Sequence, residues 1–459
     1  MRIRVPSYFV ACIAACLGAC SAHSERPVTS RAVIASVDLP PMRTFARHGV
    51  APPSRSNTEM AQDFLDLAFR LESGRDLPVL TRFEGPVRVR MAGPVPASAP
   101  ADLGKLLSRL RNEAGIDIRQ TGGSEAEIAI EFLPRRTMQR LVPRAACFVA
   151  PRVGSWDEYR SAGRNRLDWT TLSARSRSAI FIPNDTAPQE IRDCLHEELA
   201  QALGPLNDLY RLPDSVFNDD NIHTILTGFD MLMLRAYYAP ELANGMRRAE
   251  VAARLPRVLA RLNPAGERSG IAPLDPTPPA FGKAIETALG PGTFPARRRK
   301  AARDALDIAL SRSWRDARTG FAWLALGRLT LGHDAAAARL AFTQASTLYH
   351  SQPGLALQAA HADMQLAVFA LANGAPEQAI ALVDQSTGVV AAAENAALLA
   401  NLLMVKAEAL DLMGRKAEAQ AARLDSLGWA RYGFASDAEV EARLLNVAAL
   451  SPAQRARRP

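Results

Sequence analysis

The body of this sequence lacks the signals of several common protein classes. Beyond the first twenty residues no apolar run is long enough to span a membrane, since the best one, over residues 225–239, is interrupted by Asp230 and Arg235. No serine stands in a G-x-S-x-G context, and no glycine-rich loop could cradle a phosphate. The formal charge is +8, but basic residues are not interleaved with aromatics as in nucleic-acid modules. We therefore expect no later membrane span and no nucleic-acid partner, and we do not expect a serine hydrolase.

Cysteine is also scarce. Of five cysteines in 459 residues, three lie among the first twenty, and only Cys147 and Cys194 remain beyond them. Two cysteines in an oxidising compartment form a natural pair, and closing a loop of roughly 46 residues would stabilise the fold by about 3–4 kcal/mol. The sequence predicts a disulfide between Cys147 and Cys194, with two separately buried thiols as the alternative.

The N-terminal segment resembles the signal peptide of a bacterial lipoprotein. Arg2 and Arg4 precede an uncharged apolar stretch over residues 5–19. That stretch is too short for a comfortable membrane span of about 20 residues, but it suits a secretory signal. Residues 17–20 resemble the lipobox, in which an aliphatic residue and two small ones precede a cysteine. The resemblance implies that Cys20 is lipidated and becomes the mature N-terminus.

The residue after Cys20 bears on localisation. It is Ser21 rather than aspartate, and by the bacterial sorting rule this implies the outer membrane. We expect a lipid-anchored envelope protein that faces the periplasm. The alternative is an ordinary cleaved signal peptide that releases a soluble protein.

The rest of the chain divides into regions of different pattern. Residues 21–57 are rich in proline and serine and predict a flexible tether. Residues 58–263 mix helical and strand periodicities and predict an α+β domain. A proline-rich linker is expected over residues 264–294, helical repeats over 295–435, and a C-terminal helix with a frayed tail over 436–459.

Within the α+β region, local patterns predict individual elements. Apolar spacing predicts helices at residues 60–71 and 103–110. A longer helix has Pro188 in its first turn, with Thr186 able to cap it and Gln189 completing a capping box, and Gly204 ends it. Alternating or apolar runs predict strands at residues 87–91, 116–118, 128–132, 147–149 and 179–182.

The helical region carries a repeated loop signature. Gly332, Gly374 and Gly414 lie about 40 residues apart, each between an apolar helix and an alanine-rich one. The first unit resembles a tetratricopeptide repeat in degenerate form. This resemblance implies stacked helix pairs with a concave, partner-binding groove; a plain helical bundle is the alternative.

The most informative block begins at Cys194 and reads C-x-x-E-E-x-x-Q-x-L-G, followed by N-D and S-x-F-N. It resembles an uncharacterised family of secreted bacterial proteins and, beyond that, a remodelled metzincin metallopeptidase. Metzincins carry H-E-x-x-H-x-x-G-x-x-H and a later Met-turn. In that frame Glu197 and Gln201 fall on the first two metal histidines, and Asn207 falls on the third. Glu198 falls on the general-base glutamate, and Phe217 stands where the Met-turn methionine would be.

The spacing matches the metzincin pattern, but the ligands differ. Residues 197 and 201 are four apart and can project from one helix face, and Gly204 can turn Asn207 back toward them. Glutamate and amide oxygens suit calcium or magnesium better than zinc, so we expect either no cofactor or a weakly bound divalent metal.

Three interpretations remain. The first is a metzincin-like domain that has lost catalysis, with Glu197, Glu198, Gln201 and Asn207 forming a buried polar network. The second is a metal-dependent hydrolase of peptide or cell-wall polymer, with Glu198 as general base. The third treats these residues as ordinary solvated groups. We favour the first, in an envelope lipoprotein that acts as a binding or scaffold protein and holds a protein or cell-wall partner on its helical repeats.

Overall fold

The computed structural model describes residues 39–45, 52–53, 55–268 and 275–452. The chain divides into two units, residues 1–39 and 40–459, and every element below belongs to the second. Cys20, the predicted signal peptide, most of the tether and the end of the predicted tail lie outside the described residues. Among the described residues, no helix is both long and apolar enough to cross a membrane.

Residues 57–266 form an α/β region, so the predicted mixture of helices and strands is confirmed. Its elements are α1 (Asn57–Ala68), β1 (Val87–Ala92), α2 (Ala99–Glu113), β2 (Ile118–Gln120), β3 (Ile128–Leu133), α3 (Arg135–Gln139), β4 (Phe148–Pro151), α4 (Trp156–Ser161), η1 (Trp169–Thr171), β5 (Ser178–Pro183), α5 (Pro188–Leu203), α6 (Gly228–Tyr237), α7 (Arg248–Leu262) and η2 (Pro264–Gly266).

The five strands form one mixed sheet in the order β2-β1-β3-β5-β4. β1 pairs in parallel with both β2 and β3, β3 pairs in parallel with β5, and β4 runs antiparallel to β5. Ile130 lies at the centre, opposite Met91 on one side and Ile180 on the other. Parallel neighbours need a crossover, and α2 supplies the one between β1 and β2.

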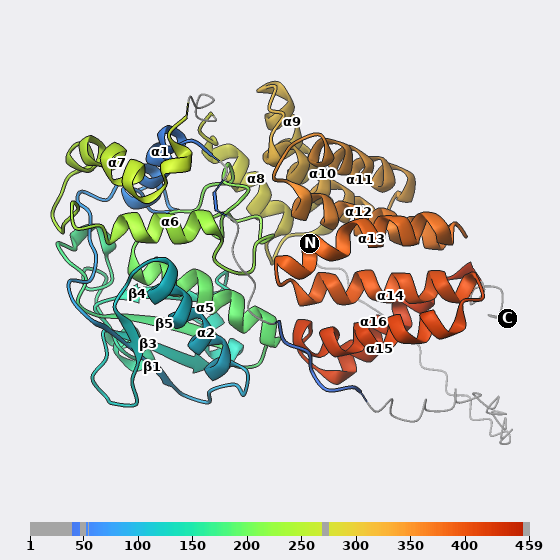
Figure 1. Cartoon of the computed structure of the whole chain (residues 1–459), viewed down its shortest axis with the longest axis horizontal. Coiled ribbons are helices and arrows are strands. Elements are labelled where there is room, and N and C mark those ends of the chain that lie inside the picture. Colours follow the sequence, from blue (N-terminus) through green and yellow to red (C-terminus); the bar gives the residue numbers. More distant parts are fainter. Residues whose placement is uncertain (1–38, 46–51, 54, 269–274, 453–459) are drawn as a thin grey trace, which may run out of the picture. The chain divides into compact units, whose positions relative to one another are not determined.

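The sheet is buried on both faces. Successive side chains of a strand point to opposite faces, and each face packs against its own apolar cluster. In β5, Ile180 and Ile182 join the main core with α1, α2 and α5, whereas Ala179 and Phe181 point to a second cluster that includes Trp156 of α4. Figure 1 shows α2 and α5 lying across the sheet. This packing places the C-terminal end of α5, which carries the predicted site, beside α1 and α6.

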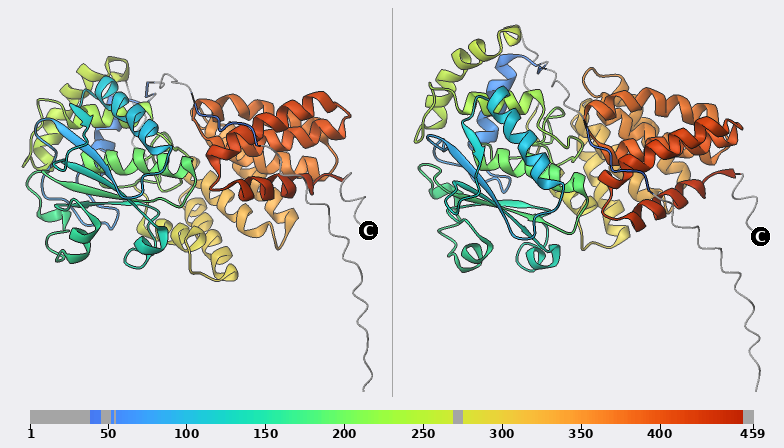
Figure 2. Two further views of the ribbon diagram at one scale, coloured as in Figure 1. Left: turned by 90° about the horizontal axis from the view of Figure 1, so that it is seen from below. Right: turned by 60° about the horizontal axis from the view of Figure 1, so that its bottom comes forward.

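The second region is all-helical, as predicted. Its helices stack in chain order in the further views (Figure 2). They are α8 (Pro279–Leu289), α9 (Pro295–Ser311), α10 (Ala317–Thr330), α11 (Ala335–His350), α12 (Ala356–Ala372), α13 (Pro376–Ala392), α14 (Ala396–Leu412), α15 (Lys416–Gly433) and α16 (Asp437–Ala448).

Two of the predicted loop glycines have a conformational role. Gly374 and Gly414 adopt positive φ angles of 73° and 75°, where a side chain would be strained. Elsewhere the small residues permit close helix contact. A Cβ atom on Gly327 of α10 would lie 2.6 Å from the ring of Phe342 on α11.

The α/β and helical regions contact each other through polar side chains. Arg192 of α5 binds the Glu394 carboxylate at 3.0 Å, and the Tyr432 hydroxyl donates to Asp102 at 2.7 Å. The segment expected to be a linker contains α8, which packs against α9. The helical stack therefore lies directly against the helix that carries the predicted site.

Candidate functional site

Helix α5 is held by a disulfide near its middle and by hydrogen bonds at its C-terminal end. Cys194 forms the predicted disulfide with Cys147, next to β4, with a Cα–Cα distance of 6.0 Å. At the C-terminal end of the helix, the buried guanidinium of Arg175 donates to the carbonyls of Gln201, Ala202 and Gly204. These carbonyls have no partners within the helix, so Arg175 fixes where α5 ends.

Gly204 makes a close approach to α6. A Cβ atom there would lie 3.0 Å from the ring of Tyr237 on α6. Tyr238, the residue directly after α6, donates a hydrogen bond from its hydroxyl to the Leu203 carbonyl at 3.0 Å. The two tyrosines therefore pack the turn after α5 against α6.

The predicted site residues are mostly buried. Glu198, Gln201 and Asn207 are 5%, 6% and 4% exposed, and Glu197 is half-buried. This burial contradicts the interpretation of the group as ordinary solvated residues. One Glu198 oxygen, Oε2, is buried without a hydrogen-bond partner among the described residues. An unsatisfied buried carboxyl of this kind is costly and is a common mark of a functional site.

The two amide side chains are engaged with other groups. The Gln201 amide donates to Asp208 at 3.4 Å, and the Asn207 amide donates to the Asp66 carbonyl at 2.9 Å. Within the described ranges, no group of three or more His, Cys, Asp and Glu side chains is arranged to hold a metal ion. The arrangement therefore does not fit the three-ligand zinc centre of a metzincin.

His196, which precedes the glutamate pair, has a structural role. Its Nδ1 accepts a hydrogen bond from the Leu226 backbone amide at 3.1 Å. Burial, with the nearby charges of Arg192 and Arg109, lowers the pKa of His196 well below its usual value. A neutral acceptor histidine agrees with this contact.

A cleft of about 1000 Å³ opens beside the end of α5. Its walls come from the C-terminal end of α1, the loop after α5, and α8. Four of its carboxyl groups form no ion pair with any described residue: Glu72, Asp208, Asp219 and Glu286. Of the cations that line it, Arg211 and Arg248 bind Asp66 and Arg70 binds Asp76. Lys283 is the one lining cation without an ion pair to a described residue, against four such carboxyls.

Glu198 lies behind this cleft. It stands one turn before Gln201 on the same side of α5, and Gln201 contacts the cleft residue Asp208. Burial is the main cause that raises the pKa of Glu198 well above its usual value, and the charges of Glu197 and Glu72 add to it. The five carboxyls of Glu72, Glu197, Glu198, Asp208 and Asp219 are called the acid cluster below.

Crowding affects Glu197 and Asp208 in the same way. Burial, together with the charges of Glu72 and Asp219, raises the pKa of Glu197 to about 8. Burial also raises the pKa of Asp208 well above its usual value, with Glu72 and Glu197 contributing. At neutral pH the cluster thus holds protons that a nearby cation would displace.

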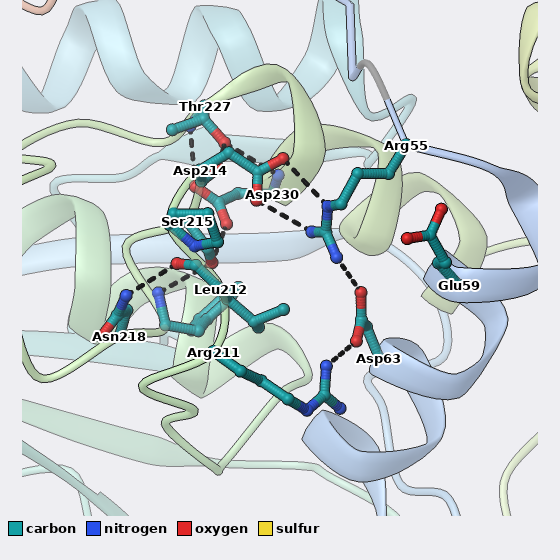
Figure 3. Close-up of polar contacts among 12 residues, drawn as sticks. Arg55, Glu59, Asp63, Arg211, Leu212, Asp214, Ser215, Asn218, Thr227 and Asp230 are labelled. Atoms are coloured by element: carbon teal, nitrogen blue, oxygen red, sulfur yellow. Dashed lines mark hydrogen bonds and ion pairs between the residues drawn. The ribbon is translucent and has the colours of Figure 1, made fainter. Parts of the chain in front are cut away.

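A polar network missed by sequence reasoning fixes the loop after α5. The fully buried Asp230 accepts the Ser215 hydroxyl at 2.5 Å and the backbone amides of Val216 and Thr227. Figure 3 shows Asp63 lying between the guanidinium groups of Arg55 and Arg211. Ser215 belongs to the S-x-F-N block, so that part of the motif positions the loop.

The other residues of this block have related roles. Asn218 donates to the Leu212 carbonyl at 2.7 Å and to Asp220 at 3.0 Å. The fully buried Phe217, at the Met-turn position, accepts the Leu209 amide through its carbonyl at 2.9 Å. These contacts close the loop that carries Asp208 and Asp219 to the cleft.

Comparison with known proteins shows that the region containing this site is similar to a family of unknown function. Residues 57–257 match the family described as "Protein of unknown function (DUF2927)". No curated protein and no solved structure gives a significant match to the chain. The match covers α1 to α7 almost completely, and so includes both the sheet and the acid cluster.

Proposed function

We propose that this chain is a lipid-anchored envelope protein that binds a partner presenting cationic groups, rather than a zinc hydrolase. The α/β region would be a metzincin-like fold without the metal centre, and the helical region a degenerate tetratricopeptide-like scaffold. The observation that carries the proposal is the acid cluster, which faces a cleft of about 1000 Å³ with carboxyls that no described cation neutralises.

Electrostatics favours a cation there. Like charges in a partly buried site disfavour their own ionisation, and a ligand ammonium or guanidinium group would relieve that repulsion. α8 contributes to one wall of the cleft, through Glu286. A protein or cell-wall partner held on the helical stack could place a basic segment in the cleft.

The first test is binding of a lysine–glycine peptide to the full chain by calorimetry, with the lysine-acetylated peptide as control. We expect binding of the unmodified peptide and at least a tenfold loss on acetylation. Affinity should increase from pH 6 to pH 8, because Glu197 ionises toward its pKa of about 8 and the cation binds the ionised form.

Matched variants localise that binding. The pair of substitutions Glu72→Gln and Asp208→Asn should weaken it at least tenfold. Glu377→Gln, at an exposed position in the first turn of α13, should leave it unchanged. Equal binding of both peptides, or an affinity that does not change with the cleft substitutions, would refute the proposal.

The second candidate is a hydrolase in which Glu198 is the general base. It is favoured by the unbonded, buried Oε2 atom of that residue. Glu198→Gln should then reduce hydrolysis of a peptide or peptidoglycan substrate by about 10²–10⁴-fold, whereas peptide binding should survive it. Near-stoichiometric metal in protein purified from periplasm without chelator, lost in Glu197→Ala and Gln201→Ala, would favour this candidate over the first.

A further inference from the structure

A second cavity, of about 390 Å³, lies between α5 and the helical stack. His196 lines it, and none of its lining residues also lines the acidic cleft, so the two are separate. Its walls are mostly apolar, as is usual for cavities that hold small molecules. Representative wall residues are Leu106 of α2, Leu226 and Phe229 near α6, Leu357 of α12 and Val389 of α13.

One wall contains a buried cation with an unused donor. Arg192 is 4% exposed, and its two terminal nitrogens bind the carboxylate and the carbonyl of Glu394 at 3.0 and 2.5 Å. Its Nε atom is buried with no hydrogen-bond partner among the described residues. The two bonds to Glu394 hold this guanidinium in place in the cavity wall.

The carboxyl groups around the cavity are already engaged. None of them is left to attract a cation. They are Asp214, bound by Arg55; Glu394, bound by Arg192; and Asp102, which accepts the hydroxyl of Tyr432.

A positive charge remains at the rim. Lys105 lines the cavity from α2, its side chain is exposed, and it donates to the Phe45 carbonyl at 3.2 Å. It forms no ion pair with a described residue. An anionic head group would therefore meet the ammonium group of Lys105 at the rim, while an apolar body would occupy the rest.

We propose that this cavity binds a small amphiphile with an apolar body and one carboxylate, of the kind exemplified by a medium-chain fatty acid. The ligand would contact both regions of the chain at once, because its site is formed by α2 and α5 on one side and by α12 and α13 on the other. The inference does not depend on the acidic cleft or on its ligand.

The test compares decanoate with decanol, which share the apolar body and differ in the head group. Calorimetry on the full chain should give one site that prefers decanoate at least tenfold. Lys105→Met should remove most of that preference and leave decanol binding intact. No saturable binding of either ligand, or equal affinity for both in the unaltered protein, would overturn the proposal.

A pair of substitutions on α13 locates the site. Val389→Trp fills the cavity from a half-buried wall position and should abolish decanoate binding. Ala381→Trp, at an exposed position on the same helix outside the cavity, should leave it unchanged. Normal binding by Val389→Trp would show that the ligand lies elsewhere. Should that variant fail to fold, the Lys105→Met comparison still decides the question.

Discussion

At the scale of single residues, the amide side chains that follow Glu198 are each held by a different neighbour. The spacing of Glu197, Gln201 and Asn207 suggested three side chains converging on one point. In the structure two of them donate amide hydrogens to Asp208 and Asp66 instead. The acid cluster also needs Glu72, which is far from α5 in the sequence. No local pattern could predict that contact, and metal binding stays a prediction that this arrangement does not favour.

Glu197 provides a test of the electrostatics. Burial and neighbouring carboxyls raise its pKa from 4.5 to about 8 in the folded chain. The folded state therefore holds a proton that the unfolded state releases, so stability decreases as pH rises between these values, by at most about 1.4 kcal/mol per pH unit.

The substitution Glu197→Gln removes this penalty. We expect a melting temperature at least about 2–4 °C above that of the unaltered protein at pH 8, and little difference at pH 4.5. Differential scanning calorimetry measures both, with Glu377→Gln as the control. A variant less stable at pH 8 would mean that the Glu197 carboxylate is ionised and paired in the folded chain.

At the scale of elements, most helices and strands could be predicted, because their apolar periodicity is local. The start of α5 is an instructive exception. Its N-cap is Ala187, with no side-chain capping bond, so the predicted capping by Thr186 and Gln189 is wrong. Gln189 instead accepts the backbone amide of Ala397 at 2.9 Å. A contact to a residue 208 positions away overrides the local preference.

The disulfide is another feature at this scale that the sequence predicted correctly. It ties α5 to the segment that enters β4, the edge strand of the sheet. Its reduction should lower the stability of the α/β region by about 2–4 kcal/mol, visible as a lower melting temperature by circular dichroism. The double variant Cys147→Ser and Cys194→Ser should melt at that lower temperature with or without reductant. An unchanged melting temperature on reduction, or free thiols in protein from the periplasm, would contradict this expectation.

At the scale of the whole molecule, the order of an α/β region and a helical region was predictable, but their contact was not. The proline-rich segment suggested a linker, yet part of it is α8, which lines the acidic cleft. Some contacts between the regions join residues about 200 or more positions apart, such as Arg192 with Glu394 and Asp102 with Tyr432. Arg192, Asp102 and Tyr432 lie in helices and Glu394 lies in the turn between α13 and α14, and nothing in their local sequence marks these contacts.

Those contacts predict how the chain unfolds. Because the ion pair of Arg192 with Glu394 is largely buried, with side-chain exposures of 5% and 19%, losing one partner should cost about 3–5 kcal/mol. We expect the full chain to melt in one calorimetric transition, and Glu394→Lys to separate it into two, since the regions then lose a buried ion pair. The control is Lys406→Glu, which reverses a charge in the ion pair with Asp384 between α13 and α14, away from this interface. It should keep a single transition.

Two transitions in the unaltered protein would mean that the regions fold independently, and the cavity between them would then lack a fixed shape in which to hold a ligand.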